Sequence, residues 1–236
     1  DGNDDTAIAK AAAVKQDGIS IVAVGFGGAN EQTMRAIASA PSSDFAFFGA
    51  SMDEVRQHFA SDRLCELAAS PKAPPPPPST PAPPGLPPSP PSPSPAPPSP
   101  PACVVKLELV LVLDKSGSVR AEQSSLLAFA REMVSQFRLD ATEGARVGVV
   151  EFSSDAATLT PLTGSLSDVL TAIDGASAAG GGTSVSDGLE LGRAEVNRGA
   201  RADVPRTILL LTDGVQTVDG NDDTAIAKAA AVKQDG

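Results

Sequence analysis

The hydrophobic pattern of this chain consists of short apolar runs that alternate with segments of helical periodicity. The clearest run covers residues 107–114, reads LELVLVLD and stops at an acid, Asp114. Further apolar runs cover residues 19–26, 45–50, 146–152, 157–162 and 206–213. Near-continuous Val, Ile and Leu runs of this length predict strands of a mostly parallel sheet that is covered on both faces.

Helices are predicted between these strands, where apolar residues recur at three- and four-residue spacing. They cover residues 31–40, 52–62, 124–137, 165–173 and 184–197, and a further one through residues 227–233 is capped by Asp222 or Asp223. The alternation predicts an α/β fold, doubly wound, with a mostly parallel sheet between helices in a three-layer sandwich. The strand at residues 157–162 contains Pro161 and is predicted at an edge of the sheet.

The chain carries an internal repeat, because residues 1–18 recur without change as residues 219–236. A duplicated tag is the alternative, but the segment has the pattern of a helix inside a fold. The repeat predicts a tandem array that is cut within a domain. Residues 1–68 are then the C-terminal half of one domain, residues 69–102 a linker, and residues 103–236 the N-terminal part of the next domain.

The predicted linker is rich in proline, with 19 Pro among the 31 residues 71–101. Proline has no backbone N–H and cannot join a helix or a sheet ladder. The segment therefore predicts a stiff polyproline II spacer of roughly 90–100 Å, at ~3.1 Å per residue. Its PxxP motifs also fit ligands of SH3 or WW domains, but its position between domain halves favours a structural spacer.

Composition excludes some classes of protein. The net charge of −11 and the pI near 4.5 argue against a nucleic-acid partner, which would need a basic face. No apolar run approaches the ~20 residues that a membrane-spanning helix needs.

Candidate metal ligands follow two of the predicted strands and one glycine-rich loop. Asp114, Ser116 and Ser118 follow the first strand, Thr183 follows Gly-Gly-Gly, and Asp213 ends the run LLLTD. In open α/β sheets ligands bind at the carboxyl ends of the strands. Five hard oxygen donors predict a site for Mg²⁺, Mn²⁺ or Ca²⁺ and not for zinc. The alternative is that these oxygens only cap loops and helix starts.

Catalytic signatures are missing from the sequence, and we expect no enzyme. There is no G-x-S-x-G elbow and no P-loop, and GFGG after residues 19–24 is not a dinucleotide fingerprint. The single histidine, His58, has no second His or nearby Cys at ligand spacing and is predicted on a helix surface.

The three motifs DKSGS, GGGTSVSDGL and LLLTDGV, in this order and spacing, resemble the von Willebrand factor A-type domain. The resemblance covers the whole unit outside the spacer and implies a metal-ion-dependent adhesion site. By this match Ser116, Ser118 and Thr183 would contact the ion directly. Asp114 and Asp213 would act through water molecules or as anchors behind the direct ligands. Few of these donors are charged, so the ion would stay electrophilic and accept a carboxylate from an acidic protein ligand.

The resemblance also bears on the two cysteines, because family members often join the two ends of the domain by a disulfide. In an array, Cys103 would pair with the next unit's copy of Cys65, and Cys65 with the preceding unit's copy of Cys103. A direct Cys65–Cys103 bond is not expected across a stiff spacer, unless the spacer bends or the chain closes as a permuted domain. Free buried thiols are the alternative.

The spacer resembles the hydroxyproline-rich, extensin- or pherophorin-like segments of plant and green-algal wall glycoproteins. The resemblance implies hydroxylation and O-linked glycans on its prolines, for which the candidates are Pro75, Pro76, Pro77, Pro78, Pro84, Pro88, Pro91, Pro93, Pro95, Pro98 and Pro101. Together these features predict an extracellular structural or adhesive repeat glycoprotein of a cell surface, wall or matrix, with copies of itself as partners in fibres or a coat. The alternative is a metal-dependent adhesion receptor.

Overall fold

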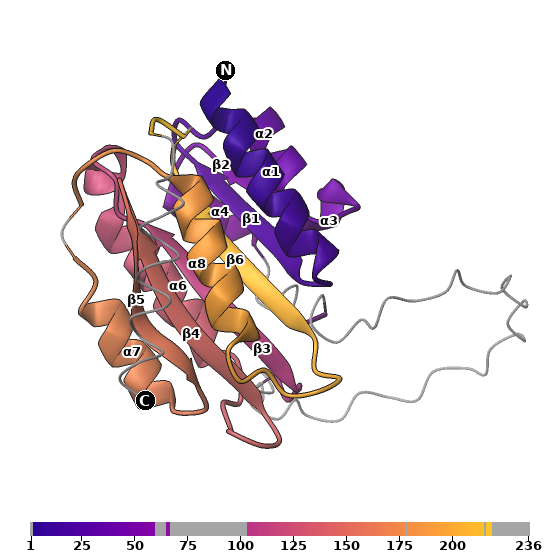
Figure 1. The fold of residues 1–236 in the computed structure, drawn as a ribbon. Coiled ribbons are helices and arrows are strands. Elements are labelled where there is room, and N and C mark those ends of the chain that lie inside the picture. The colour runs from indigo at the N-terminus through magenta and orange to yellow at the C-terminus, as the bar shows by residue number, and fades with distance from the viewer. Residues whose placement is uncertain (1, 60–64, 67–102, 178, 215, 219–236) are drawn as a thin grey trace, which may run out of the picture.

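The fold is a six-stranded sheet between two layers of helices (Figure 1). The computed structural model describes residues 2–59, 65–66, 103–177, 179–214 and 216–218. The strand order is β2-β1-β6-β3-β4-β5, and every neighbouring pair is parallel except β4 and β5. The strands are β1 (Ser20–Phe26), β2 (Ala46–Gly49), β3 (Leu107–Asp114), β4 (Ala145–Phe152), β5 (Ala156–Thr163) and β6 (Arg206–Thr212). The predicted doubly wound α/β fold is confirmed.

The helices divide between the two faces of the sheet. Their bounds are α1 (Gly2–Gln16), α2 (Glu31–Ile37), α3 (Ser42–Phe45), α4 (Met52–His58), α6 (Gln123–Ser135), α7 (Leu166–Asp174) and α8 (Val185–Asn197), with a 3₁₀ turn η1 (Ser118–Ala121). Buried residues of α4, α6 and α7 join one hydrophobic cluster, and those of α1, α2 and α8 join the other. Strand β3 shows why both layers form: Leu109 and Leu111 face the first cluster, and Val110 and Val112 face the second.

Two segments that are distant in the sequence complete this one sheet. Strand β1 pairs with β6 from Ser20↔Thr207 to Gly25↔Thr212. Residues 2–59 and 103–218 therefore fold together as a circularly permuted domain. The assignment of these segments to successive units of a longer array stays a prediction, and the second copy of the repeat, residues 219–236, lies outside the described residues.

Several element bounds differ from the sequence pattern. Helix α2 ends at Ile37, before the predicted residue 40, because the residue preceding Pro41 disfavours helix. Strand β5 continues past Pro161 to Thr163, with register shifts opposite β4. It lies at the sheet edge as predicted. Helix α1 begins at Gly2, so the counterparts of the predicted caps Asp222 and Asp223 lie inside it.

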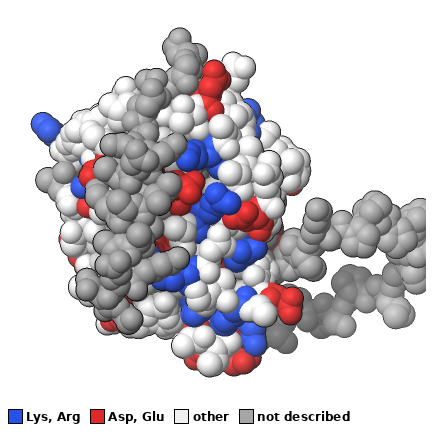
Figure 2. Space-filling view, in the orientation of Figure 1, with Lys and Arg blue, Asp and Glu red and all other residues white. Residues whose placement is uncertain are grey.

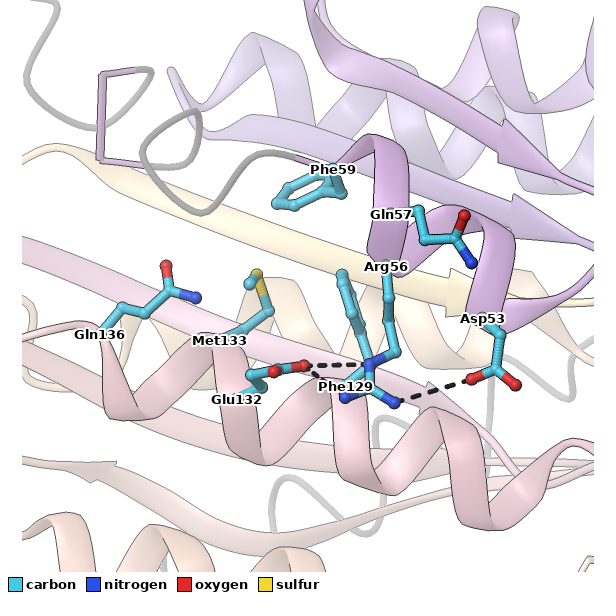
Figure 3. Close-up of a pocket in the computed structure, with 8 residues that line it drawn as sticks. All are labelled: Asp53, Arg56, Gln57, Phe59, Phe129, Glu132, Met133 and Gln136. Carbon is cyan, nitrogen blue, oxygen red and sulfur yellow. Dashed lines mark hydrogen bonds and ion pairs between the residues drawn. The ribbon is translucent and has the colours of Figure 1, made fainter. Parts of the chain in front are cut away.

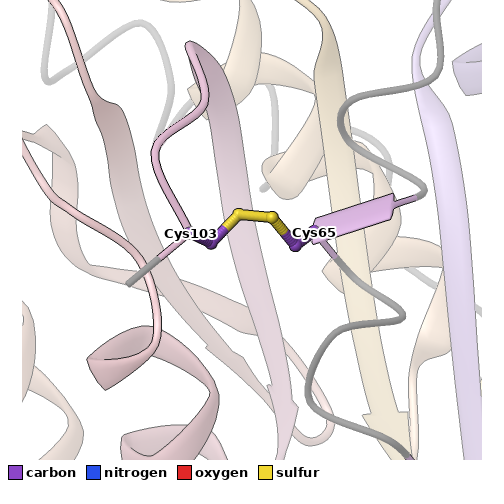
Figure 4. The surroundings of a disulfide bond; sticks show 2 residues. All are labelled: Cys65 and Cys103. Carbon is purple, nitrogen blue, oxygen red and sulfur yellow. A yellow bond between two sulfur atoms is a disulfide. The ribbon is translucent and has the colours of Figure 1, made fainter. Parts of the chain in front are cut away.

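The two cysteines are bonded to each other in this chain (Figure 4). Their Cα atoms are 5.9 Å apart, although 38 positions separate them in the sequence. Cys103 is fixed beside the end of α6, because its N–H donates to the Gln136 carbonyl at 2.7 Å. The expected pairing of each cysteine with a neighbouring repeat is thus wrong for this chain. The permuted closure of the domain brings its two ends together.

The predicted polyproline linker and its candidate hydroxylation sites lie outside the described residues. Among the helices that the structure does describe, none is long and apolar enough to cross a membrane.

Candidate metal centre

The three predicted motifs meet at the carboxyl edge of the sheet. Asp114 is the last residue of β3, and Asp213 directly follows β6. These strands are hydrogen-bonded neighbours, with Leu113 opposite Leu211. Thr183 lies just before α8, whose N-cap is Ser184. The topology therefore places all five candidate ligands around one point of the fold.

Asp114 is held in place on both of its carboxylate oxygens. Its side chain is 2% exposed. Oδ1 accepts the backbone N–H of Ser116 at 2.7 Å, which is an Asx turn, and Oδ2 accepts the hydroxyl of Thr212. The carboxylate thus shapes the DKSGS loop and ties it to β6.

The hydroxyl groups form a short chain across the site. Ser116 Oγ lies 3.0 Å from Ser118 Oγ, and Ser118 Oγ donates to Asp213 Oδ1 at 2.8 Å. Ser118 therefore links Ser116 to Asp213, so that three predicted ligands from two loops are close together.

Thr183 is held near these hydroxyl groups by hydrogen bonds between the loop before α8 and the loop after β6. Its N–H donates to Thr217 Oγ1 at 2.9 Å, and its carbonyl accepts the Thr217 N–H at 2.9 Å. A Cβ atom added at Gly214 would lie 3.4 Å from Thr183 Oγ1 and 3.7 Å from Ser118 Oγ. Gly214 thus lies close to both hydroxyls.

Burial shifts the pKa of both carboxylic acids in this site. Burial raises the pKa of Asp114 to about 6, and the neighbouring Asp213 charge adds to the rise, while hydrogen bonds from Thr212 and Ser116 oppose it. Burial and the Glu122 charge also raise the pKa of Asp213, against the hydrogen bond from Ser118. A bound divalent cation would favour the charged form of both groups.

The donor set fits a hard divalent cation. It comprises two carboxylates and three hydroxyls, the oxygen ligands that Mg²⁺, Mn²⁺ and Ca²⁺ prefer. Among the described residues there is no cluster of three or more His, Cys, Asp and Glu side chains that would hold a metal. A cation here would rely on neutral hydroxyls for half or more of its protein ligands. It would supply a Lewis-acidic centre at this edge of the sheet.

Sequence reasoning missed the residues that support the ligands. Thr212 and Thr217 flank the predicted Asp213, and only the three-dimensional contacts show that they hold Asp114 and Thr183. Glu151, at the end of β4, is buried and accepts from Lys115 Nζ at 3.0 Å and from Ser177 Oγ at 2.8 Å. A carboxylate one residue before the end of a buried strand was the available signal for Glu151.

A separate cavity of about 400 Å³ opens between α4 and α6 (Figure 3). It contains none of the predicted ligands. Its floor carries Phe59, Phe129 and Met133, and Arg56 spans its mouth between Glu132 and Asp53. The chain that continues from Phe59 lies outside the described residues, as does the side chain of His58, so we assign no ligand to this cavity.

The family model of the von Willebrand factor type A domain matches residues 1–61 and 108–236. The match covers most of the chain, and the chain belongs to this family. Comparison with curated protein sequences gave no match.

Solved structures of two kinds are similar to this chain. The proximal thread matrix protein 1 of the mussel byssus, solved with a zinc-occupied MIDAS motif, is 20% identical, with a TM-score of 0.46 over 96% of this chain and 50% of that one. The von Willebrand domain of the type V pilus tip protein Mfa5 from Porphyromonas gingivalis is 22% identical, with a TM-score of 0.40 over 49% of this chain and 40% of that one. The chain therefore spans half or less of the length of these proteins.

Proposed function

We propose that this chain is part of an extracellular structural and adhesive repeat glycoprotein. Its von Willebrand A-type domains are beads that carry a divalent cation and are joined by glycosylated polyproline rods. Copies of the protein are its partners in fibres or a cell-surface coat. The proposal assigns no catalytic role to the chain, and it places the protein in a cell surface, wall or matrix.

The observation that carries the proposal is the convergence of Asp114, Ser116, Ser118, Thr183 and Asp213 at one edge of the sheet. The hydroxyl chain from Ser116 through Ser118 to Asp213 supports a single cation site. The unchanged 18-residue repeat and the proline-rich segment support an array. A disulfide within the domain fits an oxidising, extracellular compartment.

Electron microscopy of the native protein tests the array. We expect compact beads at a regular spacing along threads, separated by roughly 90–100 Å rods. A lone compact particle with no rod would contradict the proposal. Mass spectrometry of the peptide containing residues 73–106 is the companion measurement, because hydroxyproline bearing pentoses would identify the predicted wall-type glycosylation.

A metal-dependent adhesion receptor is the second candidate function, and the neutral character of the hydroxyl ligands favours it. A cation whose charge is only partly balanced attracts an acidic group from a partner. On this interpretation, immobilised protein captures an acidic protein ligand in Mg²⁺ and releases it in EDTA. Thr183→Ala would abolish the capture, and unchanged capture by that variant would exclude this function.

A further inference from the structure

A buried ion pair connects the DKSGS loop, residues 114–118, to the end of β4. Lys115 Nζ donates to Glu151 Oε1 at 3.0 Å, and the Glu151 side chain is only 4% exposed. Lys115 lies between two of the candidate metal ligands in the sequence. Because side chains alternate along a strand and Glu151 lies opposite Leu113 of β3, its carboxylate lies on the face of the sheet that α6 and α7 cover.

Ion pairs on the outer surface of the molecule differ from this one. Lys10 of α1 and Glu190 of α8 pair on the face shown in Figure 2, where Lys and Arg are interspersed with Asp and Glu. Their side chains are 24% and 27% exposed, and such pairs contribute little because water competes with them. The carboxylate of Glu151 is shielded from water, so the loss of one of its partners leaves a buried charge without compensation.

Ser177 supplies further donors to the Glu151 carboxylate. Its backbone N–H donates to Oε2 at 2.9 Å, and its hydroxyl donates to Oε1 at 2.8 Å. Ser177 belongs to the α7–α8 loop, which is described for residues 175–177 and 179–184 and carries the candidate ligand Thr183. Through these hydrogen bonds the carboxylate joins the DKSGS loop to the loop that carries Thr183.

The same two loops are also joined by their main chains. The Gly180 N–H donates to the Lys115 carbonyl at 2.7 Å, and the Gly117 N–H donates to the Gly181 carbonyl at 3.1 Å. Lys115 donates its own N–H to the carbonyl of Phe152, the last residue of β4, at 2.8 Å. Lys115 is thus held at its N–H, its carbonyl and its ammonium group, which fixes the DKSGS loop between β4 and the α7–α8 loop.

The candidate ligands depend on this contact because they come from separate loops. Thr183 lies on the α7–α8 loop, and Ser116 and Ser118 lie on the DKSGS loop. A cation that binds hydroxyls of both loops needs a fixed separation between them. Groups that orient metal ligands without contacting the metal typically change its affinity by about 10- to 100-fold when they are replaced.

We propose that Glu151 is a positioning residue of the metal centre, which holds the α7–α8 loop against the DKSGS loop through Lys115 and Ser177. It acts through these loops and not as a ligand, and it sets the separation between the Thr183 hydroxyl and the serine hydroxyls of the DKSGS loop. This inference deepens the proposed function and rests on its cation site.

Replacement of both members of the ion pair tests the link in a chain that keeps its fold. The double variant Lys115→Met/Glu151→Gln removes both charges and keeps side chains of similar size, a change that buried ion pairs often tolerate without loss of stability. The methionine side chain cannot donate a hydrogen bond to position 151. We expect the dissociation constant for Mn²⁺, measured by isothermal titration calorimetry, to rise about tenfold or more. An affinity equal to that of the natural chain would overturn the proposal.

Hydrogen exchange without any divalent cation provides a second measurement of the link. The amides of Gly117 and Gly180 report on the contact between the loops, because each donates to a carbonyl of the other loop and not to Glu151. In NMR spectra of the ¹⁵N-labelled chain, exchange at both amides should be several-fold faster in the double variant, while the amides of β3 exchange as before. Unchanged exchange at Gly117 and Gly180 would overturn the link between the loops.

Glu195→Gln is the matched control, because Glu195 is also a buried carboxylate in an ion pair, with Arg198 at 3.2 Å. It lies near the C-terminal end of α8, away from the loop that precedes this helix. It should leave Mn²⁺ affinity and exchange at Gly117 and Gly180 unchanged, whatever its effect on the free energy of unfolding. An equal loss of affinity in this control would overturn the positioning role, since general destabilisation would then be the cause. If the natural chain bound no Mn²⁺, the proposed cation site would fail, and the exchange measurement would still decide whether Glu151 joins the loops.

Discussion

Ser118 Oγ donates a hydrogen bond of 2.8 Å to Asp213 Oδ1, across 95 positions of sequence. This contact joins the loop after β3 to the loop after β6 and closes the candidate metal centre. We expect Ser118→Ala to weaken binding of Mn²⁺ at least tenfold, because it removes a predicted ligand and frees Asp213. Isothermal titration calorimetry measures the change. Ser124→Ala, an exposed residue of α6, is the control, and equal affinity in both variants would exclude Ser118 as a ligand.

Thr212 is a positioning residue, because its buried hydroxyl donates to Asp114 Oδ2. Thr212→Val keeps the shape of the side chain but leaves a buried carboxylate oxygen without its donor. We expect a loss of about 1–3 kcal/mol in the free energy of unfolding and weaker Mn²⁺ binding.

Thr207→Val provides the matched control, because Thr207 is also buried in β6 but lies at its other end. Urea unfolding and calorimetry of both variants separate the two effects. If Thr207→Val weakened cation binding as much as Thr212→Val, the positioning role would be refuted.

Glu108 is fully buried in β3 and paired with two guanidinium groups. It accepts from Arg146 Nη2 at 2.6 Å and from Arg201 Nε at 2.8 Å. Burial alone would raise its pKa, but the hydrogen bonds from both arginines outweigh that effect and hold the pKa below its ordinary value of 4.5. We expect Glu108→Gln to lower the free energy of unfolding by about 3–5 kcal/mol at pH 7, because two partly buried guanidinium groups lose their buried charged partner.

The pH dependence of this difference has a definite sign. A carboxylate whose pKa is lower in the folded state than in the unfolded state contributes its full stabilisation at a pH above the unfolded-state pKa. This contribution is lost as the pH falls through the folded-state pKa. The difference in the free energy of unfolding between the natural chain and Glu108→Gln should therefore become smaller below about pH 4.5. Urea unfolding between pH 3 and 7 measures it. Asp174→Asn is the control, because it removes an exposed ion pair with Arg131. It should lower the free energy of unfolding by at most ~1 kcal/mol. A difference between the natural chain and Glu108→Gln that does not change with pH would contradict the role of the Glu108 carboxylate as the charged partner of the two arginines.

Gly188 lets α8 lie close to the sheet. A Cβ atom there would be 2.8 Å from Phe152 Cδ1 and 3.0 Å from Val112 Cγ1, both fully buried. We expect Gly188→Ala to lower the free energy of unfolding by about 1–3 kcal/mol through overpacking. Gly180→Ala, where the added atom meets nothing within 4 Å, should leave the melting temperature nearly unchanged. Equal effects of the two changes would show that packing at α8 is not the cause.

The sequence pattern predicts most strands well, because β1, β3, β4 and β6 are dense apolar runs. Leu107–Asp114 was predicted to the residue. The four-residue helix Ser42–Phe45 was missed, since one turn is too short to show a periodicity. The five candidate ligands could be named from the sequence because each belongs to a local motif, and their role as ligands stays a prediction. Their supports Thr212 and Thr217 act through contacts with distant residues, which no local pattern encodes.

Two other features depend on tertiary structure in the same way. Glu108 looked like an interruption of an apolar run, and its partners Arg146 and Arg201 lie 38 and 93 positions away. The Cys65–Cys103 bond was not expected, because the sequence shows the stiff spacer between the two cysteines but not the permuted closure of the sheet.

The two edge strands of the sheet are poorly suited to pair with a further strand. On one side β2 has only four residues, and on the other β5 carries Pro161 and breaks register against β4. Edge strands that are short, contain proline or pair irregularly are protected against amyloid-like association. In the proposed array, identical domains at high local density would otherwise be at risk of pairing edge to edge in a continuous cross-β sheet. With both edge strands protected, the domains of such an array could lie close together while each one keeps its own hydrophobic core.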